Sequence, residues 1–100
     1  MSNLPVLSAN ELDIALQELK SWSIEQGKLH RQFQFPSFVK AFGFMTSVAL
    51  VAETMGHHPE WCNVYNRISV DLTTHDAGGI TMNDIHLAHK MNELAESYVL

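Results

Sequence analysis

The stretch from Phe38 to Met55 restricts the fold of this chain more than any other feature, because it is the longest apolar-rich run and has two defined ends. Pro36 ends the segment before it, and Ser37 is a residue type that caps helix N-termini. Gly56 can take the left-handed conformation with which many helices end. We therefore expect one long helix from Phe38 to Met55.

The apolar side chains of this expected helix cover more than one face. The first set follows helical spacing and comprises Phe38, Phe42, Met45, Ala49, Ala52 and Met55. The second set widens this stripe almost round the helix and comprises Val39, Phe44, Val48, Leu50 and Val51. A helix that is apolar on two faces is usually buried on two sides, so we expect one side to cover a sheet and the other to contact a second copy of the chain. Because Lys40, Glu53 and several hydroxyl side chains interrupt the run, we expect it not to span a membrane.

Hydrophobic spacing and turn residues divide the rest of the chain into two helices and four strands. The predicted helices span residues 9–20 and 82–98, and each begins at a capping pair, Ser8 with Glu11 and Thr81 with Asp84. The predicted strands span residues 22–25, 28–35, 61–65 and 67–74. Hairpin connections favour antiparallel pairing, with the helices on one face of the sheet. The order α-β-β-α-β-β-α therefore predicts an α+β fold, formed by a single domain over residues 1–100.

The charge of the chain argues against several kinds of partner. The net charge is −5 and the six lysine and arginine residues are scattered, so direct binding of nucleic acid or of a polyanion is not expected. A neutral, polar small molecule fits this balance better. Cys62 is the single cysteine, so an internal disulfide is impossible, and the N-terminal residues do not resemble a signal peptide. We expect a cytoplasmic protein.

Three histidines lie at predicted element ends, where side chains can face a ligand. His57 and His58 follow the long helix and precede Pro59, which biases His58 away from helical geometry. His75 follows the last predicted strand. Imidazole groups exchange protons near neutral pH, so this placement indicates acid–base chemistry. Three carboxylates flank these histidines in the sequence: Glu53, Asp76 and Asp84.

Metal binding and nucleophilic catalysis are the weaker alternatives. Adjacent histidines do not easily present both rings to one ion, and we expect His86 and His89 on the solvated face of the last helix. The sequence contains no nucleophile elbow and no phosphate-binding loop. Cys62 has no partner at metal-ligand spacing, so we expect it to be packed in its strand. Trp61 either forms the aromatic wall of a ligand site or fills the core.

These features together resemble the pterin-4a-carbinolamine dehydratase family. The pattern that carries the resemblance is Glu53-x3-His57-His58-Pro59-x5-Tyr65-x9-His75-x8-Asp84. Segments 59–61, 63–67 and 73–81 also look like the family, and the resemblance extends from Leu12 through the last helix. Gly56 departs from it, since many relatives carry a polar or acidic residue before the paired histidines.

The resemblance implies both a fold and a reaction. The fold is a four-stranded antiparallel sheet with three helices on one face, in a homodimer or a dimer of dimers. The reaction is the loss of water from a 4a-hydroxytetrahydropterin, made by aromatic amino-acid hydroxylases, to give the quinonoid dihydropterin in tetrahydrobiopterin recycling. It requires no cofactor, metal or covalent intermediate. The alternative function is that of some family members, which act as dimerisation cofactors of a homeodomain transcription factor without binding DNA themselves.

The resemblance also implies which residues form the site. The catalytic residues would be His57, His58 and His75, of which His57 and His75 correspond to the acid/base pair and His58 to a residue that binds the pterin. Further residues would line the pocket, namely Pro59, Trp61, Thr74, Asp76 and Ala77. Glu53 and Asp84 would be supporting carboxylates that set the tautomer and charge of the histidines.

Overall fold

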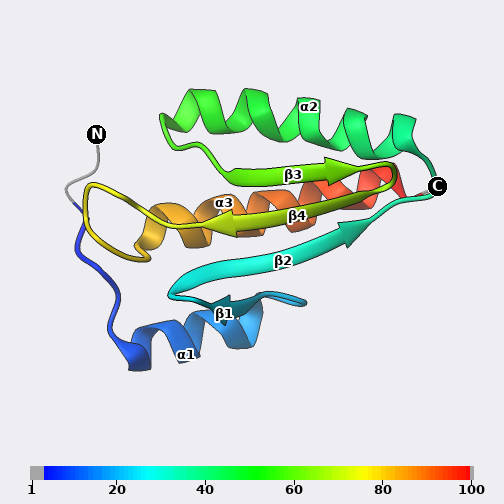
Figure 1. The fold of residues 1–100 in the computed structure, drawn as a ribbon. Helices are drawn as coiled ribbons and strands as arrows, with labels where there is room; N and C mark the ends of the chain where they lie inside the picture. The colour runs from blue at the N-terminus through cyan, green and yellow to red at the C-terminus, as the bar shows by residue number, and fades with distance from the viewer. Residues whose placement is uncertain (1–3, 100) are drawn as a thin grey trace.

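The computed structural model describes residues 4–99 and confirms the predicted order of elements (Figure 1). The helices are α1 (Ala9–Glu18), α2 (Phe38–Met55) and α3 (Met82–Ala95), and a short 3-10 turn, η1 (Glu96–Tyr98), continues the last of them. The strands are β1 (Ser23–Glu25), β2 (Lys28–Gln34), β3 (Glu60–Val64) and β4 (Arg67–Leu72). The fourth strand ends two residues earlier than predicted, because Thr74 pairs with Gly79 across a turn instead of extending the sheet.

The four strands form one antiparallel sheet in the order β1-β2-β4-β3. Alternate side chains of β2 and β4 face the helices and are fully buried: Leu29, Phe33, Ile68, Val70 and Leu72. The opposite side of the sheet, here called the open face, carries Lys28, His30, Glu60, Cys62, Ser69 and Asp71. In Figure 1, α3 runs behind the strands, α2 follows the β3 side and α1 lies near β1. The predicted arrangement of three helices on one face is therefore confirmed.

Helix α2 has the predicted bounds and caps, and it buries one side of its apolar surface. Ala41, Phe44, Val48 and Ala52 are the buried residues. The aromatic ring of Phe44 fixes this rotation, because it packs against two core rings, with centroid distances of 4.8 Å to Phe33 and 4.9 Å to Phe35. The first predicted set divides between the two sides of the helix, since Ala52 is buried whereas Phe38, Phe42 and Ala49 are exposed.

The outer side of α2 remains strongly apolar. Its exposed members are Phe38, Val39, Phe42 and Leu50, of which Val39 is 76% exposed. By length and composition alone, Phe38–Met55 is apolar enough to cross a membrane, a test that the core helix of a soluble protein also passes, so the expectation that it does not span one stays a prediction. In the fold, the helix covers the sheet along one side and presents an unpartnered apolar side, as the two-faced sequence pattern predicted.

Candidate active site

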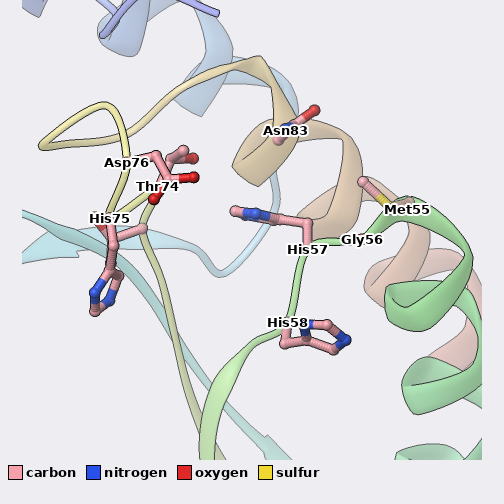
Figure 2. A pocket seen from close by; sticks show the side chains of 9 residues that line it. Met55, Gly56, His57, His58, Thr74, His75, Asp76 and Asn83 are labelled. Atoms are coloured by element: carbon pink, nitrogen blue, oxygen red, sulfur yellow. The ribbon is translucent and has the colours of Figure 1, made fainter. Parts of the chain in front are cut away.

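A pocket of about 270 Å³ lies where the end of α2, the turn after β4 and the start of α3 meet (Figure 2). The residues that line it are Met55, Gly56, His57, His58, Thr73, Thr74, His75, Asp76 and Asn83. Its volume is close to the lower end of the range for small-molecule sites, about 300–1,000 Å³. The pocket is partly open to solvent.

Gly56 directs the chain from α2 into this pocket. It has φ 65° and ψ 29°, the left-handed conformation that ends many helices. The amides of Gly56 and His57 donate to the carbonyls of Glu53 and Ala52, at 3.1 Å each, and so complete the helix end. Nothing lies within 4 Å of a Cβ built on Gly56, so its conformation, and not a lack of space, favours glycine here. Asparagine also tolerates this conformation.

His57 is the buried histidine of the site, and its ring reaches toward Thr74 (Figure 2). Its Nε2 lies 2.5 Å from Oδ1 of Asp84, which is fully buried. The second oxygen of Asp84 accepts from the Thr74 hydroxyl and from the Thr81 amide, at 2.9 Å each. Three donors thus surround one carboxylate, as a buried charge requires. Asp84 therefore caps α3 and also orients His57, a combination that the capping pattern alone does not show.

His58 turns to the other side of the same peptide, as Pro59 predicted, and its side chain is 63% exposed (Figure 2). Its Nε2 lies 2.8 Å from Oε1 of Glu53, in the last turn of α2. Glu53 is thus a supporting carboxylate, as expected, but it pairs with His58. The carboxylate that orients His57 is Asp84.

His75 lies on the opposite rim of the pocket, on the turn between Thr74 and Gly79 (Figure 2). Its Nε2 lies 2.7 Å from Oε2 of Glu60, the first residue of β3. The sequence pattern placed Asp76 beside this histidine, but no hydrogen bond joins the two side chains within residues 4–99. Glu60 was missed because it is distant in sequence and becomes a neighbour only through the pairing of β3 with β4.

All three histidines share one arrangement. In each ring, Nε2 is held by a carboxylate, from Asp84, Glu53 and Glu60 respectively. Because an ionised carboxylate only accepts hydrogen bonds, this contact places the proton on Nε2, and within residues 4–99 Nδ1 has no hydrogen-bond partner and can exchange a proton. The pocket therefore has three imidazole rings, each with Nδ1 available. Two of them follow α2 and the third follows β4.

The structure brings together most of the expected site residues. His57, His58, Thr74, His75 and Asp76 line the pocket, whereas Pro59, Trp61 and Ala77 do not. Trp61 is half-buried and packs against the core, which favours the second of its two predicted roles. The sequence analysis missed three lining residues: Met55, Thr73 and Asn83. Nothing in the sequence indicated these three residues except that each lies within two positions of a predicted site residue.

The residues considered for other chemistry lie away from this pocket. His86 and His89 are exposed on α3, as expected. Cys62 is exposed on the open face, so the expectation that it is packed was wrong; its alternation with Trp61 turns it away from the helices. Within residues 4–99, no group of three His, Cys, Asp or Glu side chains is placed to hold a metal ion.

Comparison with known proteins agrees with the motif and the fold. The family model described as pterin 4 alpha carbinolamine dehydratase matches residues 5–94, which is most of the chain. This chain belongs to the pterin-4-alpha-carbinolamine dehydratase family. A Solibacter usitatus protein that bears the same family name is 58% identical over 89 residues, covering 89% of this chain and 94% of that protein. A second relative, from Prochlorococcus marinus, is 45% identical over 92 residues, covering 92% and 97%.

A solved structure of the dehydratase family has the same fold. The crystal structure of a transcriptional coactivator/pterin dehydratase from Brucella melitensis is similar to this chain with a TM-score of 0.87 and 46% sequence identity, covering 90% of this chain and 98% of that one. The pterin dehydratase fold is therefore established here by sequence and by structure together.

Proposed function

We propose that this protein is a hydro-lyase that removes water from a 4a-hydroxytetrahydropterin. Membership of the dehydratase family supports the reaction, since relatives over nearly their full length bear the name of that enzyme. The observation that carries the proposal is the pair His57 and His75, on opposite rims of one pocket, each held through Nε2 by a carboxylate. We further propose that it acts in the cytoplasm on the product of an aromatic amino-acid hydroxylase.

The reaction requires one proton to arrive and one to leave. The 4a-hydroxyl leaves as water after it accepts a proton from an acid, and a base takes the proton from N5 as the C4a–N5 double bond forms. In this mechanism His57 and His75 are the acid/base pair, and each uses its free Nδ1 for the transfer. Histidine is the side chain most often used to give and take protons in such steps.

The remaining polar side chains of the pocket suit the polar edge of a pterin ring. His58, also counted among the catalytic residues, would hold the ring with its own free Nδ1. Asp76 and Asn83 line the pocket, and within residues 4–99 neither side chain has a hydrogen-bond partner. A carboxylate and an amide can pair with the amino, N–H and oxo groups of a pterin. Thr74 is already engaged by Asp84 and Thr81, so it shapes the pocket wall.

The test is the rate of carbinolamine loss after the protein is added to a hydroxylase reaction. We expect an acceleration over the spontaneous rate, and a loss of about tenfold to ten-thousandfold in His57→Ala and in His75→Ala. His89→Ala is the matched control, because His89 is an exposed histidine outside the pocket. An unchanged rate in both pocket variants would reject the assignment, and no acceleration by the natural protein would reject the function.

A second candidate function is that of a protein-interaction module, a dimerisation cofactor of a transcription factor. The exposed apolar side of α2 favours it, as does the similarity to the Brucella melitensis transcriptional coactivator/pterin dehydratase. A stable hetero-complex formed on mixing with the dimerisation segment of a homeodomain factor would support this function. A homo-oligomer that keeps α2 covered at low concentration and forms no such complex would contradict it.

A further inference from the structure

We propose that Glu60 is a positioning residue for His75, and that Lys28 holds Glu60 in the geometry this requires. The inference deepens the proposed dehydratase function and rests on His75 being part of its acid/base pair. Glu60 does not line the pocket, so it would act only through the histidine. It is not one of the named positions of the spaced motif, although it lies in segment 59–61, which also looks like the family.

The three side chains form a chain of contacts across the open face of the sheet. Nζ of Lys28 lies 2.6 Å from Oε1 of Glu60, and Nε2 of His75 lies 2.7 Å from Oε2 of the same carboxylate. Each oxygen therefore has one partner. Lys28 begins β2, Glu60 begins β3, and His75 follows the end of β4, so the chain of contacts joins three segments at one end of the sheet.

His75 has less support from surrounding side chains than His57 has. The His75 side chain is 73% exposed, whereas the His57 side chain is 10% exposed and packed beside a buried carboxylate. Within residues 4–99, Glu60 is the one residue that hydrogen-bonds the His75 ring. A free imidazole interconverts between two tautomers and rotates about its side-chain torsions. The contact with Glu60 selects the tautomer with the proton on Nε2 and leaves Nδ1 free.

Lys28 fixes the carboxylate in turn. The hydrogen bond with Glu60 raises the pKa of Lys28 above its ordinary value, so the ammonium group stays charged throughout the working range of the enzyme. The other carboxylates near this chain of contacts lie against a different histidine. Asp71 is 2.9 Å from the His30 ring, and Glu25 is 4.0 Å from the same ring. Glu60 therefore does not exchange its partner for another histidine on this face.

The experiment combines kinetics with nitrogen NMR of the full-length protein. For Glu60→Ala we expect kcat to fall on the order of tenfold with little change in KM, since partners behind a functional histidine contribute at about this level. We expect Lys28→Met to cause a smaller loss of the same kind. The ring-nitrogen chemical shifts of His75 should move from a single Nε2–H tautomer toward a mixture in Glu60→Ala.

Asp71→Asn is the matched control, because it removes a neighbouring carboxylate that contacts His30 and not His75. It should leave both the rate and the His75 shifts unchanged. In a His75→Ala background, Glu60→Ala should have no further effect on the rate. Additive losses in that background, or unchanged His75 shifts in Glu60→Ala, would overturn the inference. If the natural protein accelerates nothing, the dehydratase function fails, while the NMR comparison still decides whether Glu60 sets the tautomer.

Discussion

At the scale of single residues, the site depends on carboxylates that each have a structural and a chemical role. Asp84 is the clearest case, because one oxygen holds Nε2 of His57 and the other closes the N-terminus of α3. A fully buried carboxylate is tolerated only when its lone pairs are satisfied, and here Thr74, Thr81 and His57 satisfy them. The position of the histidine is thus tied to the stability of the helix.

We expect Asp84→Asn to weaken both roles without changing the size of the side chain. The amide oxygen can still accept from Thr74 and Thr81, but the amide nitrogen then meets the Nε2–H of His57 and forces the other tautomer. The free energy of unfolding should fall by about 1–3 kcal/mol, and the dehydration rate should fall by at least about tenfold. Chemical denaturation and the carbinolamine assay measure the two effects. Asp13→Asn, an exposed change on α1, is the control, and equal behaviour of the two variants would contradict the role of Asp84.

At the scale of elements, the close packing of η1 against α2 depends on one glycine. A Cβ added at Gly43 would lie 2.8 Å from Cε1 of Tyr98, which is too close for any carbon contact. The Tyr98 hydroxyl lies 2.6 Å from Oγ of Ser47, one turn further along the same helix. Because Gly43 has no side chain, the Tyr98 ring of η1 can pack directly against α2.

We expect Gly43→Ala to destabilise the protein, although alanine is the better helix former by about 1 kcal/mol. Displacing the Tyr98 ring should cost about 1–3 kcal/mol, which outweighs that gain. In a Tyr98→Ala background the clash is absent, so the same Gly43→Ala change should stabilise. Denaturant midpoints of the four proteins in this cycle test the reversal of sign, and the same sign in both backgrounds would refute the packing argument.

At the scale of the whole molecule, the apolar outer side of α2 is the surface that a single copy of the chain leaves exposed to solvent. Phe42 is 53% exposed and Leu50 is 68% exposed on a helix whose other side covers the core. Large apolar side chains gathered on one helix face commonly mark an interface. We propose that copies of this chain associate through this side of α2, in a dimer or a dimer of dimers.

We expect Phe42→Glu to lower the oligomeric state while the fold stays intact, because a charge buried in an apolar interface is strongly unfavourable. Sedimentation or light scattering measures the assembly, and circular dichroism reports the fold. Ile14→Glu is the matched control, because Ile14 is 55% exposed but lies on α1. A natural protein that stays monomeric at high concentration, or a loss of assembly in Ile14→Glu as well, would exclude the proposed interface.

Local chemistry made much of this structure predictable. The capping residues predicted from the sequence mark helix ends as the structure has them, because capping depends on residues within one turn. They are Ser8 with Glu11 for α1, Ser37 and Gly56 for α2, and Thr81 with Asp84 for α3. Alternation in β2 placed Leu29 and Phe33 on the buried face, because successive strand side chains point to opposite sides.

The spacing of the histidine motif also located three of the pocket residues and identified the family, since the family signature is itself a sequence pattern. Contacts between distant segments required the tertiary structure. The sequence could not show that α2 turns Phe44 inward and Phe42 outward, because the core rings of Phe33 and Phe35 decide that rotation. Nor could it assign each carboxylate to its histidine, since strand pairing brings Glu60 to His75 and helix packing brings Asp84 to His57. Sequence determined the order of the elements and where the helices begin, because capping is local, and tertiary packing determined which faces and which charges meet.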